Sequence, residues 1–427
     1  MESAETNIGI GFITGRKTFK KVFRTYMNSF AQNGMLNGGI NMTLFIAYDL
    51  DYTNTRLSDY MITDKEDMKH VRNIHYFGKK EIKEEVAFLT GSGVLTHKEA
   101  QLIFGEGYGK KRNIIMYNAI MSQMDYLLFI DDDEYPVAPS RQGNEPLIWR
   151  GQDIIKTHLH HIRDVDITNG YHCGYISPIP HIEYNYQISE TDYQMYIEGL
   201  SNDILNWKSI KGKFEDGGVS YADEKLMEAG NSKEIEGVNA KFVSGSNLCI
   251  NLGSNVENIP PFYNPPGARG EDTFFSTGLG GLKVLRVPCH AFHDGFQQYN
   301  CLLSGVLPLE LMKENALVSA NISRFLAASI GWARYKPLLL YITHRNEYEY
   351  LIKEARERLT IQVPKFCDYF HAQGFQMVLN EFEDYHKSVE RHFESYVESK
   401  LSWKKLVAYA MSAHNTERMV DTQLGAI

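Results

Sequence analysis

The feature that most constrains this chain is a short apolar segment that runs directly into four acids, DYLLFIDDDEYP at 125–136. The acids are Asp131, Asp132, Asp133 and Glu134, and they follow the most apolar part of the stretch without a break. Neighbouring carboxylates repel one another, and close pairs raise each other's pKa. An apolar strand with this ending therefore predicts that something cationic binds at its carboxyl end.

Short apolar segments alternate with helical patterns through the first third of the chain. Strands separated by helices are typical of a parallel sheet that is covered on both faces. In open sheets of this kind, ligands bind beyond the carboxyl ends of the strands. We therefore expect the polar residues that follow three of the strands to meet in one crevice. The expected strands are 7–14, 42–48, 72–78 and 126–130, and apolar residues at helical spacing predict a helix between 19 and 30.

Composition narrows the class of protein. A chain of 427 residues has room for two or three domains of about 150 residues each. Hydrophobic residues make up 43% of it, which suits a globular protein. The net charge of −9 argues against general nucleic-acid binding, which normally needs a basic face. The region at about 140–300 mixes strand and loop character, and the region from about 305 has helical spacing, so we expect boundaries near 140 and 300.

The sequence predicts a cytoplasmic protein. Its first residues lack the basic and apolar regions of a signal peptide. No uncharged apolar stretch reaches the ~18 residues of a spanning helix. The five cysteines are scattered, as expected for reduced thiols. Lys404 and Lys405, with aromatic residues nearby, leave a peripheral membrane contact open, and a homodimer is also left open.

Two motifs suggest a metal and a phosphate. Asp131 and Asp133 share one side if strand geometry continues past the apolar segment, and Mg²⁺ commonly takes one or two carboxylates together with phosphate oxygens. Upstream, GEGYGKKRN at 105–113 is a Gly-rich turn before a helix, so its backbone N–H groups and basic side chains could meet an anion. The turn matches neither the Walker loop nor the dinucleotide fingerprint.

Taken together, these motifs resemble the GT-A glycosyltransferases, especially the large inverting family two. The shared order is a basic Gly-containing turn ending in Arg-Asn, a helix, an apolar strand and an Asp-x-Asp motif. Downstream, GARGEDTFF at 267–275 is similar to the family's Glu-Asp motif, and VPCHAFHDGF at 287–296 resembles its late strand with a metal-binding histidine. The resemblance covers about residues 7–295. One stretch departs from it, because 79–105 stands where the family has a short link, and we expect this insertion to form a lid or a partner surface.

The resemblance implies an α/β fold of the GT-A type, with a mainly parallel central sheet followed by a helical C-terminal region. The catalytic domain would span 1–300, with a nucleotide half at about 1–140 and an acceptor half at about 141–300, and 301–427 would form the helical domain. The implied activity moves a sugar from a UDP- or GDP-sugar to a hydroxyl of a carbohydrate or glycan acceptor. Mn²⁺ or Mg²⁺ would assist, the anomeric centre would invert, and the product would belong to glycan or polysaccharide synthesis.

The resemblance also assigns roles to individual residues. Asp49 would contact the nucleobase, and Asp272 would take the proton from the acceptor hydroxyl, with Glu271 as its substitute or as an acceptor ligand. The full set implied for the donor is Thr14, Arg16, Asp49, Arg112, Asp131 and Asp132; for the metal, Asp131, Asp133 and His293; and for the acceptor, Trp207, Ser246 and Asn247.

Other interpretations of the same residues stay open. Glu271 and Asp272 also suit a helix N-terminus, where the helix dipole favours acids. His290 is a second histidine after the late strand, and the histidines within 158–161 lack the further ligand that a zinc site needs. The scaffold could instead serve a retaining sugar transferase, a nucleotidyltransferase, or a nucleotide-binding scaffold without turnover.

Overall fold

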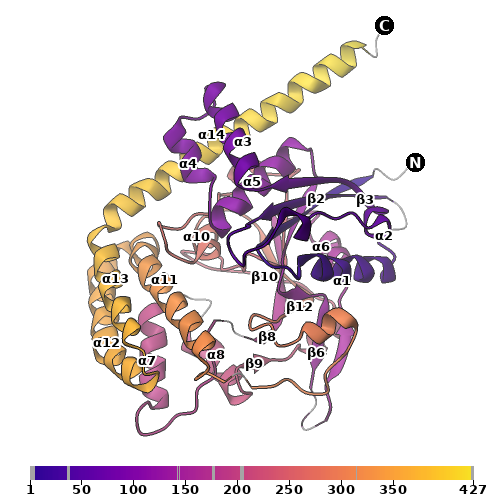
Figure 1. Ribbon diagram of the computed structural model, residues 1–427. Helices are drawn as coiled ribbons and strands as arrows, with labels where there is room; N and C mark the ends of the chain where they lie inside the picture. The colour runs from indigo at the N-terminus through magenta and orange to yellow at the C-terminus, as the bar shows by residue number, and fades with distance from the viewer. Residues whose placement is uncertain are drawn as a thin grey trace.

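The computed structural model describes residues 5–35, 39–141, 143, 145–175, 178–201, 206–313 and 315–424 (Figure 1). The chain folds around one large sheet whose main path runs in the order β10-β12-β8-β11-β4-β1-β2-β3. A short second sheet pairs β6 with β7. The strands are β1 Thr6–Thr14, β2 Ile40–Tyr48, β3 Val71–Phe77, β4 Tyr126–Asp131, β5 Glu134–Tyr135, β6 Val137–Ser140, β7 Ile148–Gly151, β8 Ile167–Tyr175, β9 Val219–Ser220, β10 Lys233–Glu234, β11 Leu248–Asn251 and β12 Val284–His293.

The direction of the strands brings many of their carboxyl ends to one edge. β1 is parallel to both β2 and β4, and β2 is parallel to β3. β11 is antiparallel to both β4 and β8, so β4 and β8 point the same way, and β12 is parallel to β8. The α/β class expected from the sequence is therefore confirmed, but the sheet is mixed and not mainly parallel, because β10 and β11 run against their neighbours.

Buried apolar residues on both faces explain the central strands. The last seven residues of β1 are all buried, as expected for a strand covered by helices on both sides. Phe12 packs on one face against Phe19 of the following helix α1, with ring centroids 5.3 Å apart. On the other face, a Cβ at Gly11 would lie 2.9 Å from Ile115. The glycine thus lets helix α5 approach the strand.

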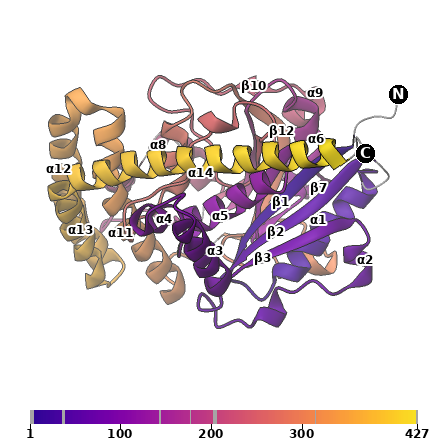
Figure 2. The same cartoon turned by 90° about the horizontal axis from the view of Figure 1, so that it is seen from above.

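Helices cover both faces of the sheet and form a separate layer at one side (Figures 1 and 2). Their bounds are α1 Phe19–Gln32, α2 Lys65–Met68, α3 Lys79–Gly91, α4 His97–Ile103, α5 Tyr108–Met121, α6 Ile154–His161, α7 Glu190–Leu200, α8 Trp207–Glu215, α9 Glu224–Ala229, α10 Glu271–Thr277, α11 Ser319–Thr343, α12 Tyr348–Tyr369, α13 Gln376–Lys387 and α14 Val389–Leu424.

The helical C-terminal region expected from the sequence is confirmed, and it builds its own aromatic core with α7. Tyr196 of α7 stacks on Phe366 of α12, with ring centroids 3.8 Å apart. The long helix α14 then runs back over α4 and α5 (Figure 2). Trp403 of α14 is fully buried there, and its indole N–H donates to the carbonyl oxygen of Ile259 at 2.9 Å. Among the described residues, none of the helices combines the length and the apolar run that a bilayer crossing requires.

The insertion at 79–105 folds as the two helices α3 and α4, which pack against each other after β3. α14 fixes this hairpin from outside, because Lys405 binds Glu99 and Lys98 binds Glu398 in ion pairs. Leu89 and Ala100 are fully buried in the core below the hairpin. The insertion is thus an integral part of the sheet domain in this structure.

Candidate functional site

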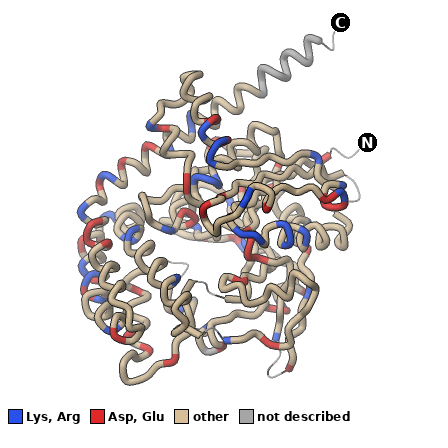
Figure 3. The backbone as a smooth tube through the Cα atoms, in the orientation of Figure 1, with Lys and Arg blue, Asp and Glu red and all other residues tan. Residues whose placement is uncertain are grey.

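The four acids lie in the tight turn from β4 into β5, at the edge where the carboxyl ends meet. Figure 3 shows acidic and basic residues close together at this central position. Asp132, Asp133 and Glu134 are only 5%, 9% and 4% exposed, so their carboxylates depend on partners from the protein. The turn leads directly into β5, and the pairing of β5 with β12 sets Glu134 opposite His293.

Arg16 and Thr14, at the end of β1, bind the acids directly. One guanidinium nitrogen of Arg16 donates to Asp132, and the other lies 3.0 Å from the carboxylate of Asp133. The hydroxyl of Thr14 donates to Asp132 at 2.6 Å. The resemblance implied that these two residues lie beside the base or ribose of a nucleotide. In the structure their polar groups instead contact the carboxylates of the acid turn.

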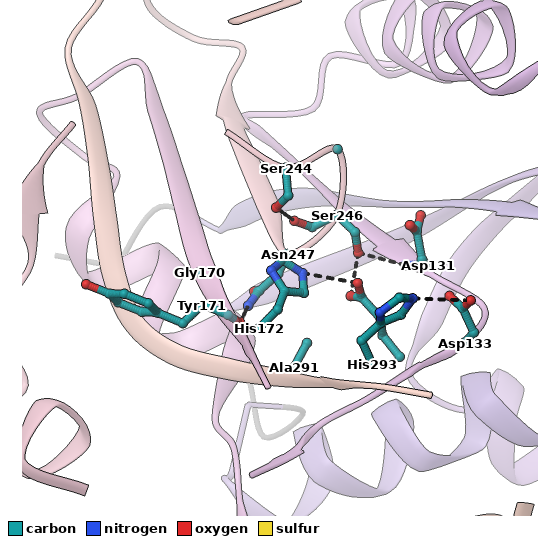
Figure 4. Close-up of polar contacts among 12 residues, drawn as sticks. Asp131, Asp133, Gly170, Tyr171, His172, Ser244, Ser246, Asn247, Ala291 and His293 are labelled. Carbon is teal, nitrogen blue, oxygen red and sulfur yellow. Dashed lines mark hydrogen bonds and ion pairs between the residues drawn. The ribbon is translucent and has the colours of Figure 1, made fainter. Parts of the chain in front are cut away.

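His293 faces the same turn from the end of β12 (Figure 4). Its Nδ1 donates to the carbonyl oxygen of Tyr175 at 2.9 Å, and its Nε2 lies 3.5 Å from Asp133. Burial opposes the charged imidazolium, but Asp133 and Glu134 raise the pKa of His293 to about 9. Burial likewise opposes a charged Asp133, yet Arg16 and His293 hold its pKa well below the ordinary value.

His290 is not the histidine that reaches the acids. It is 3% exposed and stacks on Tyr171, with ring centroids 5.3 Å apart. Burial lowers the pKa of His290 to about 4, so this imidazole stays neutral. Of the two histidines that the sequence offered, the structure brings His293 to the site.

Arg112 of α5 connects the acid turn to the Glu-Asp motif. Its guanidinium donates to Asp131 at 3.0 Å, to Glu271 at 2.8 Å and to the carbonyl oxygen of Gly245 at 3.0 Å. Burial raises the pKa of Asp131 to about 8, although Arg112 acts against this rise. The resemblance implied that Arg112 approaches a diphosphate. In the structure the guanidinium of Arg112 is occupied by the two carboxylates.

Glu271 and Asp272 begin α10 after Gly270, which has a φ of 88° that favours glycine. Asp272 differs from its neighbour, because no cation pairs with it among the described residues. Its carboxylate accepts the backbone N–H of Thr273 at 2.8 Å. Burial and the nearby Glu271 raise the pKa of Asp272 to about 6. Asp272 is therefore the less occupied of the two acids that the sequence singled out, and its raised pKa makes it more basic than an ordinary aspartate.

The raised pKa predicts that the ionised carboxylate of Asp272 destabilises the folded protein at pH values above the pKa that this group has in the unfolded chain. A carboxyl whose pKa rises on folding is fully tolerated at pH values below its unfolded pKa and increasingly costly above it. Asp272→Asn should therefore raise the free energy of unfolding by about 2 kcal/mol at pH 8 and by about half that at pH 5. Urea unfolding at the two pH values measures the change.

The neighbouring acid provides the control for this prediction. Glu271→Gln removes a partner of Arg112 and should lower the free energy of unfolding at both pH values. A gain for Asp272→Asn that is equal at pH 5 and pH 8, or a loss, would contradict the proposed environment of Asp272.

Asp49, at the end of β2, forms an ion pair with Lys111 at 2.6 Å. Burial opposes its charge, but the Lys111 ammonium keeps the pKa of Asp49 below the ordinary value. A hollow of about 140 Å³ lies beside this pair, and Thr14 and Tyr108 also line it. Asp49 therefore borders an opening near the acid turn, as expected for a ligand-binding residue.

The three acceptor candidates lie in different places. Ser246 is in the site: its hydroxyl donates to Glu134 at 2.6 Å and accepts the backbone N–H of Asp131 at 3.0 Å (Figure 4). Asn247 is buried beneath, where its side chain bonds the backbone of Tyr171 and the ring of His158. Trp207 lies in the aromatic core of the helical layer. Only Ser246 reaches the acid turn.

Two side chains at the site were not predicted from the sequence. His172 of β8 lies 3.1 Å from Glu134, and this contact keeps the pKa of Glu134 below its ordinary value although burial opposes it. Arg324 comes from α11, beyond the recognised motifs. It donates to the carbonyl oxygen of Gly295, and its guanidinium lies 5.2 Å from the ring centroid of Phe296. A lone arginine in the apolar first half of α11 was the signal that could have found it.

Arg324 is a half-buried cation whose charge is not neutralised by an ion pair. Among the described residues, no carboxylate lies within ion-pair distance of it. The loop that it binds is hydrogen-bonded to the acid turn, since the N–H of Asp294 donates to the carbonyl oxygen of Asp133 at 2.9 Å. Burial lowers the pKa of Arg324, while Asp133 acts to raise it. The site thus holds a positive group that is able to meet an anion.

Of the three residues that the resemblance implies as metal ligands, Asp133 and His293 lie together and Asp131 does not join them. Among the described residues, no three His, Cys, Asp or Glu side chains form a cluster that could bind a metal ion. Asp133 and His293 nevertheless face each other, and the Nδ1–H bond to a carbonyl is the usual support of a ligating imidazole. Magnesium and manganese sites with one or two protein ligands take the rest from phosphate and water. The carboxylate of Asp131 is held by Arg112 instead.

Comparison of the sequence with protein-family models and with curated proteins finds no match.

Proposed function

We propose that this chain is a metal-dependent glycosyltransferase of the GT-A type that moves a sugar from a nucleotide-diphosphate sugar to an acceptor hydroxyl with inversion. The observation that carries the proposal is the meeting of four motifs that are separate in the sequence. Asp133 faces His293, and Arg112 joins Asp131 to the Glu271–Asp272 pair. The parallel half β3-β2-β1-β4, followed by a mixed half, is compatible with this fold.

The leaving group requires positive charge, because a nucleoside diphosphate gains charge as the sugar departs. Mn²⁺ or Mg²⁺ would be held by Asp133 and His293 and would supply that neutralisation when bound. Arg324 of α11 would bind the diphosphate, since it is a half-buried cation without a carboxylate partner in the described part of the site. Asp49 and the hollow beside it would receive the nucleoside end.

Asp272 supplies the base that an inverting transfer needs. Its pKa of about 6 leaves it ionised at neutral pH and makes it a stronger base than an ordinary aspartate. It would accept the proton of the acceptor hydroxyl while that oxygen bonds to the anomeric carbon and the bond to the diphosphate breaks. Glu271 is bound to Arg112 and would orient the site.

A thermal-shift screen tests the proposal. The protein is melted with UDP- and GDP-sugars, with and without Mn²⁺, because a ligand that binds only the folded state stabilises it by RT ln(1 + [L]/Kd). We expect a metal-dependent rise in Tm for one class of donor, followed by transfer with inverted anomeric configuration by NMR. The absence of any shift with all donors would overturn the proposal, and a shift without transfer would favour a nucleotide-binding scaffold without turnover. Retention at the anomeric carbon would overturn Asp272 as base.

Arg324 gives a separate prediction about the diphosphate. Arg324→Gln should weaken binding of UDP or GDP by at least about tenfold, because a charged hydrogen bond contributes about 1.5–3 kcal/mol. Binding of UMP or GMP should change much less, since these lack the second phosphate. Calorimetric titration in the presence of Mn²⁺ measures the four affinities.

The control for Arg324 is Arg72→Gln, which removes the same charge from an exposed position at the amino end of β3. It should bind all four nucleotides like the unmodified protein. Arg324→Lys should recover part of the diphosphate affinity. Equal losses for monophosphates and diphosphates in Arg324→Gln would show that the residue only supports the loop at Gly295.

A further inference from the structure

A large apolar chamber lies between the α3–α4 hairpin and the segment that follows β2. Its volume is about 1100 Å³. Ile82, Val86 and Ala87 of α3 form one wall, and Tyr48 and Phe104 contribute to the others. Lys79 and Glu106 also line the chamber and form an ion pair at 2.8 Å. The chamber is built largely by the insertion, outside the motifs that suggested the function.

The chamber adjoins the candidate donor site. Asp49, Tyr52 and Lys111 line both the chamber and the smaller hollow that reaches Thr14. Tyr52 is 54% exposed and lies over the end of β1, where a Cβ at Gly15 would be 2.6 Å from its side chain. An exposed aromatic side chain thus stands at the boundary between the two spaces.

The two volumes indicate which space can hold a ligand. Ligand sites usually measure about 300–1,000 Å³, so the hollow of about 140 Å³ beside Thr14 is too small by itself. The chamber is large enough and has mostly apolar walls, with the polar pair Asp49–Lys111 where it adjoins the smaller hollow. A nucleobase has apolar faces and a polar edge, so its chemistry matches this arrangement. A purely aliphatic ligand would offer nothing to the polar pair.

We propose that the α3–α4 hairpin forms the base-binding wall of the donor site, with the nucleobase inside the chamber, stacked on Tyr52 and with its polar edge at Asp49 and Lys111. This inference rests on the proposed function and adds a wall and a stacking residue to it. The wall is held in place by α14 through its ion pairs with Lys98 and Glu99 of α4. The hairpin therefore determines which bases fit.

Filling the chamber tests the proposal. Ala87 is exposed toward the chamber and is not part of the core, so Ala87→Trp should fold normally. Calorimetry with Mn²⁺ compares three probes: UDP, GDP and inorganic pyrophosphate. We expect Ala87→Trp to weaken the binding of whichever nucleoside diphosphate the protein binds by at least about tenfold. The affinity for pyrophosphate should stay unchanged. Phe88→Trp is the control, because Phe88 is the next residue and does not line the chamber.

Tyr52→Ala is the second variant. Stacking of a base on an aromatic side chain corresponds to roughly a tenfold to hundredfold change in affinity, and pyrophosphate should again bind as before. Unchanged UDP and GDP affinities in both variants, or equal losses for pyrophosphate, would overturn the inference. Binding of pyrophosphate but of neither nucleotide by the unmodified protein would also overturn it. Failure to bind all three probes would instead contradict the proposed function.

Discussion

Replacement of Asp133 by asparagine should reduce sugar transfer by about 10³-fold or more, because the metal that neutralises the leaving diphosphate contributes several kcal/mol to the transition state. Asparagine keeps the shape of the side chain but loses the charge that faces His293. The fold should persist, since Arg16 keeps its second partner, Asp132. Transfer rates at saturating donor and Mn²⁺ titration by calorimetry measure the two effects.

Asp132→Asn is the matched control for this experiment. Both acids contact Arg16, but Asp132 also accepts the hydroxyl of Thr14 and has no ion pair with His293. Its replacement should leave Mn²⁺ affinity nearly unchanged. Unaltered transfer in Asp133→Asn would refute the metal assignment, and equal loss of Mn²⁺ binding in both variants would show that the whole turn, and not Asp133, holds the ion.

Arg112→Gln should lower the free energy of unfolding by about 3 kcal/mol, because it removes a buried guanidinium and leaves two half-buried carboxylates without their partner. Two carboxylates depend on this guanidinium, those of Asp131 and Glu271. Arg112→Lys should rescue little, since an ammonium cannot reproduce the planar fork that reaches three acceptors. Urea unfolding at neutral pH measures the loss.

Two variants separate the charge effect from general damage to α5. Lys110→Gln changes the neighbouring cation, which donates to a backbone carbonyl, and should cost less than about 1 kcal/mol. Combining Arg112→Gln with Asp131→Asn and Glu271→Gln should recover part of the stability, because the two carboxylates that Arg112 pairs with are then removed as well. A triple variant that is less stable than Arg112→Gln would contradict this account.

The strands near the N-terminus could be predicted because each is buried on both faces and reads as an apolar run. β1, β2 and β4 lie within a few residues of the expected segments. The direction of β11 could not be predicted, since a strand of four buried residues looks the same in parallel and antiparallel pairing. The antiparallel pairing of β11 with β4 and β8 therefore could not be foreseen.

The candidate site was predictable where short motifs carry it and not where contacts cross the chain. Asp131, Asp133 and His293 were found because polar residues follow apolar strands. The partner of Arg16 was missed, because nothing local in the sequence shows that its side chain turns toward Asp132 and Asp133. Arg324 was missed because α11 reaches the site only through the packing of the helical layer. The sequence around Arg324 contains no motif that indicates ligand binding.

The return of α14 over α4 and α5 has a consequence for how the protein is made. Glu99 and its partner Lys405 are 306 positions apart, and ribosomes add residues from the N-terminus at about 5–20 per second. Helix α14 is therefore synthesised tens of seconds after the α3–α4 hairpin that it packs against. During this time the apolar surface of the hairpin is exposed and accessible to chaperones. Ordering of the chamber would then be a late step in biogenesis, so a nascent chain halted before Trp403 should lack a finished donor pocket.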